Sequence, residues 1–451
     1  MKQVFLGMLV VLVVLSGLAW WIRPKPVQDG KTVLTWCSDD NPARREQIAL
    51  FNRLYPQYRL QLDPGNNGME KVIVQSMAGV GPDLFDIYQP GACIETGIAW
   101  DITDALRKAD VDFTNDVWEV VHPYVLQDGR VYGFPRNAAT DAVFYNKAIF
   151  EQNGIPVPQA RLGSEEFLEL ARKLTVMEPN GRPKHFGFLF QWWQWQTFVY
   201  QWGGHVYSAD GTRCIADCAE TIAAVQFMHD LIWKYKVSPS PIQETAMATS
   251  GGWGTGAVTL FGGGRAAMAL GGRYWLCLLR DKRQYPDLRI GAVEVQCGPV
   301  RRYWGYGGAV MINQRSPRRE QALDFMIYMT GREYNELINH QADAMGPMKR
   351  FVETDLFLRD AAYPDEDYNQ VWRDVMAHSE PRETSEFING TVADRIVSEQ
   401  LDLVRNNQKT AAEAMKTAAQ QINRQIEKNV GKFKAMKTRY DALRAGKADS
   451  L

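Results

Sequence analysis

The stretch that decides the fold is YGFPRNAATDAVFYNKAIFEQNGIPVP, residues 132–158. Its second half carries the signals of a short helix. Asn146 can cap a helix over residues 147–152, and Gly154 can end that helix in a left-handed conformation. The two prolines that follow cannot continue a helix. The stretch therefore predicts a strand, a short helix and a turn.

Strand and helix signals alternate in the hundred residues before this stretch. The expected strands cover residues 32–36, 58–62 and 84–88, and the expected helices cover 43–55 and 70–78. Short connections between such elements predict a parallel α/β sheet. Ligands of these sheets bind beyond the carboxyl ends of the strands, which here are residues 38–40 and 88–90.

With these neighbours, residues 132–158 resemble the hinge and first second-lobe helix of bacterial extracellular solute-binding proteins of family 1, the sugar-capturing subunits of ABC importers. Four more segments resemble that family in the same order: the first strand with its helix, GVGPDLFD at 79–86, FGGGRAAMALGGRYW at 261–275 and GYGGAVMINQRS at 305–316. Arg265 stands where the family more often has Lys. The resemblance covers most of residues 31–428.

The resemblance implies an α/β, two-lobed periplasmic-binding-protein fold of type II. Each lobe would be a mostly parallel sheet flanked by helices, and a hinge of several chain crossings would join the lobes. The implied first lobe is 31–137 plus 308–345, and the second is 138–307 plus 346–428. One long helix is expected over 392–427, on the second lobe. Residues 429–451 form a polar C-terminal extension, expected as a solvated helix or a partner surface.

Composition supports this division and limits the partners. A chain of 451 residues is long enough for two lobes. Its 51 basic and 52 acidic side chains leave a net charge of −1, so no basic field is available for nucleic acid. We expect a monomer that binds no nucleic acid.

Residues 1–30 are expected to be a signal or anchor with a linker. The apolar run 4–22 would span about 28 Å as a helix, close to the thickness of a bilayer core. It fits a cleaved secretory signal, with small residues at 17 and 19, or a retained membrane anchor. Trp20 and Trp21 favour the anchor, because tryptophan suits the membrane interface. The family resemblance implies a location in the periplasm or at the extracytoplasmic face of the inner membrane.

Cysteine and histidine give no metal signal. The six cysteines permit disulfides in an exported protein, and Cys214 with Cys218 is the favoured pair. No Cys-x-x-Cys occurs, and the six histidines lack ligand spacing. We expect neither a metal site nor a cofactor.

Three tryptophans lie within four residues of QWWQWQT at 191–197. At 100° per residue they cannot all point into a core, so some should be exposed. Exposed indole beside amide groups suits a pyranose, which offers an apolar face and fixed hydroxyls. The alternative is that all three rings pack under the surface.

Other candidates come from strand ends and from the family positions. The full set of predicted ligand-binding residues is Ser38, Asp39, Tyr88, Gln89, Asn137, Trp192, Trp193, Gln194, Trp195, Trp253, Arg273, Trp275, Trp304 and Tyr306. Arg273 departs from the family, where a small residue is more frequent. It would bind a carboxylate or phosphate on the ligand, or else pair with Asp281 or Glu294.

The sequence predicts a binding protein and no catalysis. Asp83 and Asp86 could be read as a glycosidase pair, but they flank a buried strand. No nucleophile elbow, phosphate loop or zinc-protease motif occurs. The prediction is capture of a mono- or oligosaccharide and delivery to an ABC permease. The alternatives are an exported carbohydrate-active enzyme, a binder of a sugar or polyol phosphate, and a tethered sensor or scaffold.

Overall fold

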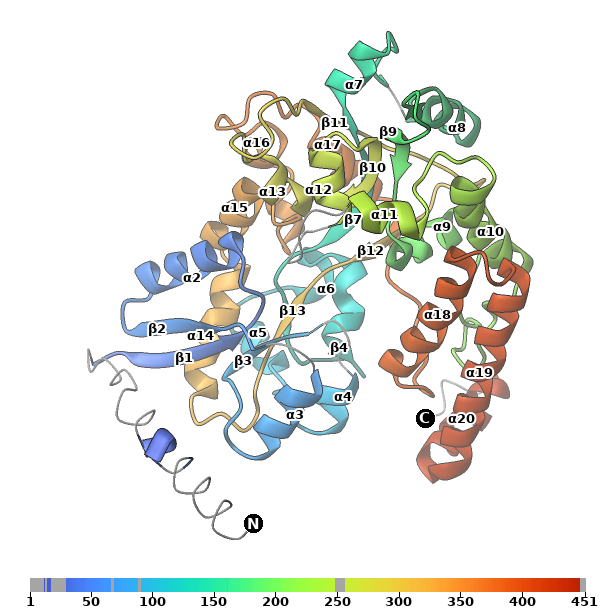
Figure 1. The fold of residues 1–451 in the computed structure, drawn as a ribbon. Helices are drawn as coiled ribbons and strands as arrows, with labels where there is room; N and C mark the ends of the chain where they lie inside the picture. The colour runs from blue at the N-terminus through green and yellow to red at the C-terminus, as the bar shows by residue number, and fades with distance from the viewer. Residues whose placement is uncertain are drawn as a thin grey trace.

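The computed structural model describes residues 12, 14–17, 30–65, 69–87, 91–159, 161–247 and 256–446. Two sheets organise these residues into two bodies, which we call the first and second lobes (Figure 1). The first sheet has the order β2-β1-β3-β13-β6. Its strands are β1 Thr32–Cys37, β2 Tyr58–Asp63, β3 Leu84–Ile87, β6 Phe134–Pro135 and β13 Ala309–Ile312.

The predicted alternation of strands and helices is confirmed in the first lobe. Helices α2 (Pro42–Leu54) and α3 (Met69–Met77) separate three strands, and β1 pairs in parallel with both β2 and β3. Asn41 caps α2 by accepting a hydrogen bond from the Arg44 backbone N–H, and Pro42 begins the helix. The cap residue and the proline that start this helix can both be recognised in the sequence.

The second sheet has the order β14-β12-β7-β10-β9-β8, with β11 also paired to β7. Its strands are β7 Ala139–Asn146, β8 Val176–Met177, β9 Pro183–Leu189, β10 Ala266–Gly272, β11 Ile290–Val293, β12 Tyr303–Tyr306 and β14 Ser379–Glu380. Here the expected mostly parallel pairing is wrong, since β7 pairs antiparallel with β10, β11 and β12. For β12 the reason is that β7 carries the chain into this lobe and β12 carries it back beside β7.

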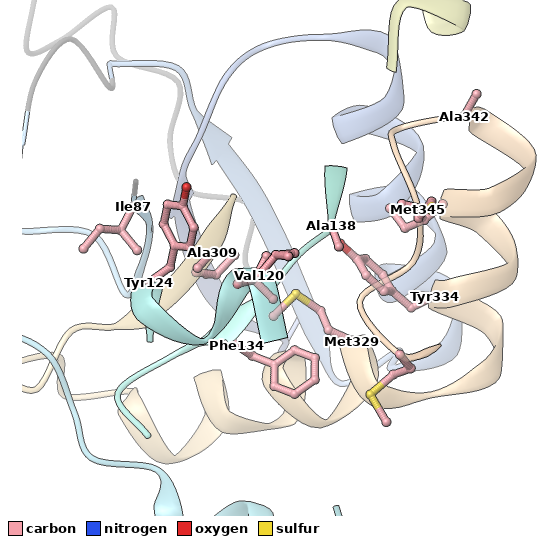
Figure 2. Packing of buried hydrophobic residues seen from close by; sticks show 14 of the residues in the cluster. Ile87, Val120, Tyr124, Phe134, Ala138, Ala309, Met329, Tyr334, Ala342 and Met345 are labelled. Atoms are coloured by element: carbon pink, nitrogen blue, oxygen red, sulfur yellow. The ribbon is translucent and has the colours of Figure 1, made fainter. Parts of the chain in front are cut away.

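Short helices and a hairpin complete the first lobe. They are α4 Gly91–Glu95, α5 Thr103–Lys108, α6 Phe113–Asp116, the 3-10 helices η1 Glu119–Tyr124 and η4 Lys349–Phe351, the strands β4 Leu126–Gln127 and β5 Arg130–Val131, and the helices α14 Arg319–Thr330 and α15 Arg332–Gln341. Figure 2 shows how Phe134 of β6, Ala309 of β13 and Met329 of α14 pack together in its core.

The second lobe carries the other helices. They are α7 Lys147–Gln152, α8 Ser164–Lys173, η2 Trp192–Gln194, α9 Trp195–Gln201, α10 Ala219–Trp233, α11 Pro241–Met247, α12 Ala257–Gly262, η3 Arg273–Trp275, α13 Leu276–Leu279, α16 Asp355–Leu358 and α17 Gln370–Met376. The helix predicted over 147–152 is confirmed: Asn146 caps it, and Gly154 is left-handed at a φ of 65°.

Three chain segments cross side by side where the two sheets meet. The backbone of Ala138 exchanges two hydrogen bonds of 3.0 Å with Met345, and the Arg136 N–H donates to the Gly308 carbonyl at 2.9 Å. A Cβ on Gly307 would collide with the Asn137 carbonyl, so only glycine permits this approach. The crossing therefore holds 136–139, 306–309 and the segment around 345 together.

The single helix predicted over 392–427 is wrong. The chain forms α18 (Gly390–Arg405) and α19 (Ala411–Lys432), followed by α20 (Lys434–Arg444), as Figure 1 shows. Asn407 breaks the helix in a left-handed conformation at a φ of 55°, and Thr410 starts α19 with a capping box to Glu413. Of the residues expected as a polar extension, 429–432 thus continue α19 and 434–444 form α20.

Most of the apolar run 4–22 lies outside the described residues. Among the residues that the structure describes, no helix is both long enough and apolar enough to cross a bilayer.

Candidate functional site

A cavity of about 430 Å³ lies beside the tryptophan segment of the second lobe. Its walls come from η2, the start of α9, β12 and α18. The aromatic and apolar lining residues are Phe190, Trp192, Trp193, Trp195, Trp304 and Leu401, and the polar ones are Gln191, Gln196, Glu244, Arg382, Asp394, Ser398, Asp402 and Arg405. The structure thus brings four of the predicted tryptophans to one cavity.

The three tryptophans of this segment lie in two helices of different type. Trp192 and Trp193 lie in the 3-10 helix η2, and Trp195 begins the α-helix α9. Gln191 and Gln194 hold this start by bonding each other's backbone N–H groups. Trp193 is 41% exposed, whereas Trp192 and Trp195 are each 9% exposed. The expectation that some of these rings reach the surface is met by Trp193.

The exposed ring of Trp193 belongs to an aromatic group with β12. Its centroid lies 5.8 Å from Trp304 and 5.6 Å from Tyr306, in both cases edge-to-face. The rings of Trp304 and Tyr306 are themselves 4.7 Å apart. The indole N–H of Trp304 is buried and has no hydrogen-bond partner among the described residues.

Ion pairs neutralise both arginines of the cavity. Arg382 forms a two-pronged pair with Asp394, with one contact of 3.1 Å, and Arg405 pairs with Glu244 at 2.6 Å. Asp402 is exposed at the wall and has no basic partner among the described residues. With three acids against two arginines, the lining has a formal charge of −1. Such a lining favours uncharged or cationic ligands over anionic ones.

Behind the aromatic group lies a buried acid. The Tyr306 hydroxyl donates a hydrogen bond of 2.8 Å to Asp141, and Thr197 lies 3.5 Å from its other oxygen. Burial raises the pKa of Asp141 to about 6, although hydrogen bonds from its neighbours favour the charged form. Gln194 is buried beside it and donates to the Leu270 carbonyl at 3.3 Å. Gln194 therefore holds the tryptophan segment in place and does not itself line the cavity.

The candidates from the first lobe lie at the carboxyl ends of its strands, near the chain crossing. The Ser38 hydroxyl donates to Asp86 at 2.6 Å, and the amide of Asn137 bonds the Asp343 carbonyl and the Gly308 N–H. Both side chains are buried and serve the protein interior.

Asp39 differs from these two because its side chain is 26% exposed. Two arginines stand 3.9 Å behind it, Arg44 and Arg136, and both also approach Asp343. None of the three first-lobe candidates lines the cavity of the second lobe.

Arg273 requires a correction. It is 1% exposed, and its three nitrogens donate to the Asn369 side chain and to the backbone carbonyls of Ala344 and Asn339 at 2.8–3.0 Å. Both readings of this residue are wrong, since it neither faces the cavity nor pairs with Asp281 or Glu294. Its role is to hold the crossing segment around 339–344 against the second lobe.

Trp275 is also an interior residue. It is 1% exposed and stacks on Phe144 with ring centroids 5.6 Å apart. Three other candidates, Tyr88, Gln89 and Trp253, lie outside the described residues.

The carboxylates that could be read as a glycosidase pair have structural partners. Asp83 bonds Thr35, Ser316 and Arg318, and Asp86 bonds Ser38 and the Trp36 indole. The described residues contain no cluster of three or more metal-binding side chains.

The predicted pairing of Cys214 with Cys218 is wrong, since all six cysteines are free thiols. The Cys218 sulfur lies 3.2 Å from the Thr221 hydroxyl at the start of α10, and the Cys214 backbone is tied to Asn423 of α19.

Sequence reasoning missed the α18 wall. Asp394, Ser398 and Asp402 recur every four residues, which places them on one face of the helix. The apolar stripe beside them indicates only that α18 packs on the lobe. No pattern within the sequence of α18 indicates that this helix contacts the tryptophan segment, which lies about two hundred residues earlier in the chain.

Comparison with known proteins identifies the class. The sequence profile of bacterial extracellular solute-binding proteins matches residues 38–336. The chain belongs to this family of binding proteins. The resemblance drawn from its motifs is therefore confirmed, and membership implies a location outside the cytoplasm.

Individual relatives are distant. A protein of Brucella abortus (strain 2308) described as a binding protein is 23% identical over 350 residues, which cover 73% of this chain and 78% of that protein. The ABC substrate-binding protein Lmo0181 from Listeria monocytogenes, solved in complex with cycloalternan, has a TM-score of 0.74 at 20% identity and covers 88% of this chain and 99% of its own.

UgpB from Mycobacterium tuberculosis, solved with glycerophosphocholine, has a TM-score of 0.72 at 18% identity and covers 89% of this chain and 100% of its own. At these identities the solved structures show the fold, and the two-lobed fold class is confirmed.

Proposed function

We propose that this protein captures an uncharged mono- or oligosaccharide in the aromatic cavity of the second lobe and delivers it, unaltered, to an ABC permease. The observation that carries the proposal is the combination of Trp193, Trp304 and Tyr306 beside a cavity of about 430 Å³. Aromatic faces stack on the C–H faces of a sugar, and amide and hydroxyl groups orient its hydroxyls.

The free energy of aromatic stacking alone is too small for micromolar binding, so polar groups must also contribute. Only Trp193 is substantially exposed, and one indole face that loses about 100 Å² of water contact contributes about 2.5 kcal/mol, before the cost of ordering the ligand. Micromolar affinity requires about 8 kcal/mol net. Hydrogen bonds from Gln191, Gln196 and Ser398, which line the cavity, would supply part of the difference. Contacts made when the lobes close would supply the rest.

We propose that the lobes close on the ligand. Every residue that lines the cavity belongs to the second lobe, while Asp39 of the first lobe is partly exposed at the strand ends. Rotation about the crossing would bring the Asp39 edge over the sugar. Ligand contacts with both lobes would then favour the closed state, which the permease would recognise. In this proposal the rigid bodies are 31–137 plus 308–345 and 138–307 plus 346–428, except that η4 moves with the first lobe, to which Lys349 and Arg350 are paired.

Ligand charge separates this proposal from its nearest alternative, a sugar or polyol phosphate. That alternative was suggested by Arg273, which is committed to carbonyl groups. The two arginines at the cavity are paired with acids. An anion would have to displace Glu244 or Asp394, so a neutral ligand fits better.

The remaining parts of the function follow from the family and the sequence. We propose that residues 4–22 anchor the chain at the extracytoplasmic face of the inner membrane, that it acts as a monomer, and that it requires no cofactor. We propose no catalytic step, because Asp83 and Asp86 are occupied by structural hydrogen bonds.

A ligand screen tests the proposal. A ligand that binds only the native state raises the melting temperature, so a thermal-shift screen should find a hit among neutral sugars and none among sugar phosphates. Calorimetry on the hit should give one site per chain. New reducing ends after incubation would instead support the carbohydrate-active enzyme. A hit confined to phosphorylated ligands would contradict the neutral-sugar proposal.

A further inference from the structure

The C-terminal helices carry a concentration of positive charge that the binding function does not use. Between 424 and 444 there are seven basic side chains and two acidic ones, which gives this segment a net charge of +5 in a chain of net charge −1. All seven are exposed: Arg424, Lys428, Lys432, Lys434, Lys437, Arg439 and Arg444. We call these seven residues with Phe433 the basic C-terminal surface.

Most of this charge is uncompensated. Lys437 pairs with Asp441 at 2.7 Å, and Arg439 pairs with Glu386. The other five basic residues have no carboxylate partner among the described residues. Since like charges repel, a surface of this kind has an electrostatic cost that an anionic partner would relieve.

The surface is presented by an ordered helix. Met436, Tyr440 and Leu443 pack α20 against the second lobe, and Tyr440 meets Phe387 edge-to-face at 5.1 Å. This contact fixes which face of α20 is buried and leaves the cations outside. In Figure 1, α20 lies at the end of the second lobe below α18 and α19.

An apolar side chain stands within the cations. Phe433 connects α19 to α20 and is 48% exposed, with the Lys432 ammonium 5.2 Å from its ring centroid. Basic side chains around an exposed aromatic ring are the composition of helices that lie in a membrane interface. The ring can enter the headgroup region while the lysines meet lipid phosphates.

We propose that the basic C-terminal surface docks on an anionic phospholipid membrane, with Phe433 in the headgroup layer. Charge complementarity and the exposed ring favour this occupant over an acidic protein, since a protein interface core is depleted of lysine. Each basic side chain held near an anionic membrane strengthens binding about fivefold. Docking would hold the second lobe at the membrane surface, whatever ligand the cavity takes.

Hydrogen exchange of the full chain with vesicles tests the proposal. The apolar run 4–22 could insert into any bilayer, so protein-free phosphatidylcholine vesicles are compared with vesicles of phosphatidylcholine and phosphatidylglycerol. Amides of 424–444 should exchange at least fivefold more slowly with the anionic vesicles only. The protection should disappear in 0.5 M salt, because salt screens exposed charges.

Two lysine triples provide the matched comparison. Lys428→Gln, Lys432→Gln and Lys434→Gln together should abolish the protection, whereas Lys108→Gln, Lys184→Gln and Lys236→Gln, at exposed sites elsewhere, should preserve it. Both triples remove three charges from exposed positions, so folding should be unaffected. Equal protection with both vesicle types, or an unchanged first triple, would overturn the proposal. Protection only by membranes that contain proteins would assign the surface to a protein partner.

Discussion

Tyr306 donates a hydrogen bond of 2.8 Å to the buried carboxyl group of Asp141, and it does so between β12 and β7, the two strands that join the lobes. The same tyrosine ring contacts Trp193 and Trp304 at the cavity. One hydrogen bond thus links the aromatic wall to the start of the second sheet.

The first prediction is a pH dependence of stability. Burial raises the pKa of Asp141 to about 6, so between about pH 4 and pH 6 the folded protein binds a proton that the unfolded chain releases. The contribution of Asp141 to stability is complete below about pH 4 and is lost as the pH rises through 6. The gap between 3.8 and about 6 corresponds to about 3 kcal/mol.

Urea unfolding of wild type and Asp141→Asn at several pH values checks this. Asn preserves an acceptor for Tyr306 but does not titrate. The stability of wild type relative to the variant should fall by up to about 3 kcal/mol between pH 4 and pH 7. A difference that stays constant over this range would show that Asp141 titrates normally.

The second prediction concerns Trp193. Trp193→Ala should weaken sugar binding at least tenfold, about 1.4 kcal/mol, because it removes the exposed ring of the cavity. Calorimetry measures the affinity. Trp202→Ala serves as the control, since Trp202 packs on Phe227 and does not line the cavity. Equal affinities for wild type and Trp193→Ala would remove this ring from the binding site.

The third prediction is a change in charge preference. Glu244→Gln would release Arg405 from its ion pair at the cavity wall. Affinity for a phosphorylated sugar relative to the neutral sugar should then rise about tenfold, since an unpaired guanidinium binds phosphate well. Competition titrations measure this ratio. Glu169→Gln, which breaks the exposed pair with Lys173, should leave it unchanged.

The fourth prediction separates Arg273 from ligand binding. Arg273→Ala removes the donors to the buried Ala344 carbonyl and to the Asn369 side-chain oxygen, while the Asn339 carbonyl keeps the Ala342 N–H, so the free energy of unfolding should fall by at least about 3 kcal/mol. Arg265→Ala, at an exposed position nearby, should change it by less than about 0.5 kcal/mol. If Arg273→Ala instead lowered ligand affinity at unchanged stability, the arginine would belong to the binding site.

The sequence predicted local elements well because their signals are local. The strand and helix alternation over 32–87 and the Asn146 cap agree with the structure. The break in the long C-terminal helix was also readable, in principle, from Asn407 and the Thr410 and Glu413 capping box. The strong helix-forming residues on both sides of the break led to the prediction of a single helix.

The site was harder to predict because tertiary contacts define it. Trp193 and Arg273 both follow plausible patterns, yet one is exposed at the cavity and the other is buried under a crossing segment. Whether a polar or aromatic side chain is exposed depends on what packs over it. The α18 wall, which closes the cavity, comes from a part of the chain with no motif.

Mass spectrometry of the retained ligand tests the central claim most directly. Purified protein would be incubated with mixed neutral and phosphorylated oligosaccharides, washed and denatured. The account predicts one neutral saccharide per chain, with the mass at which it was supplied, and loss of this ligand in Trp193→Ala. Recovery of shortened products, of phosphorylated sugars alone, or of no saccharide would contradict it.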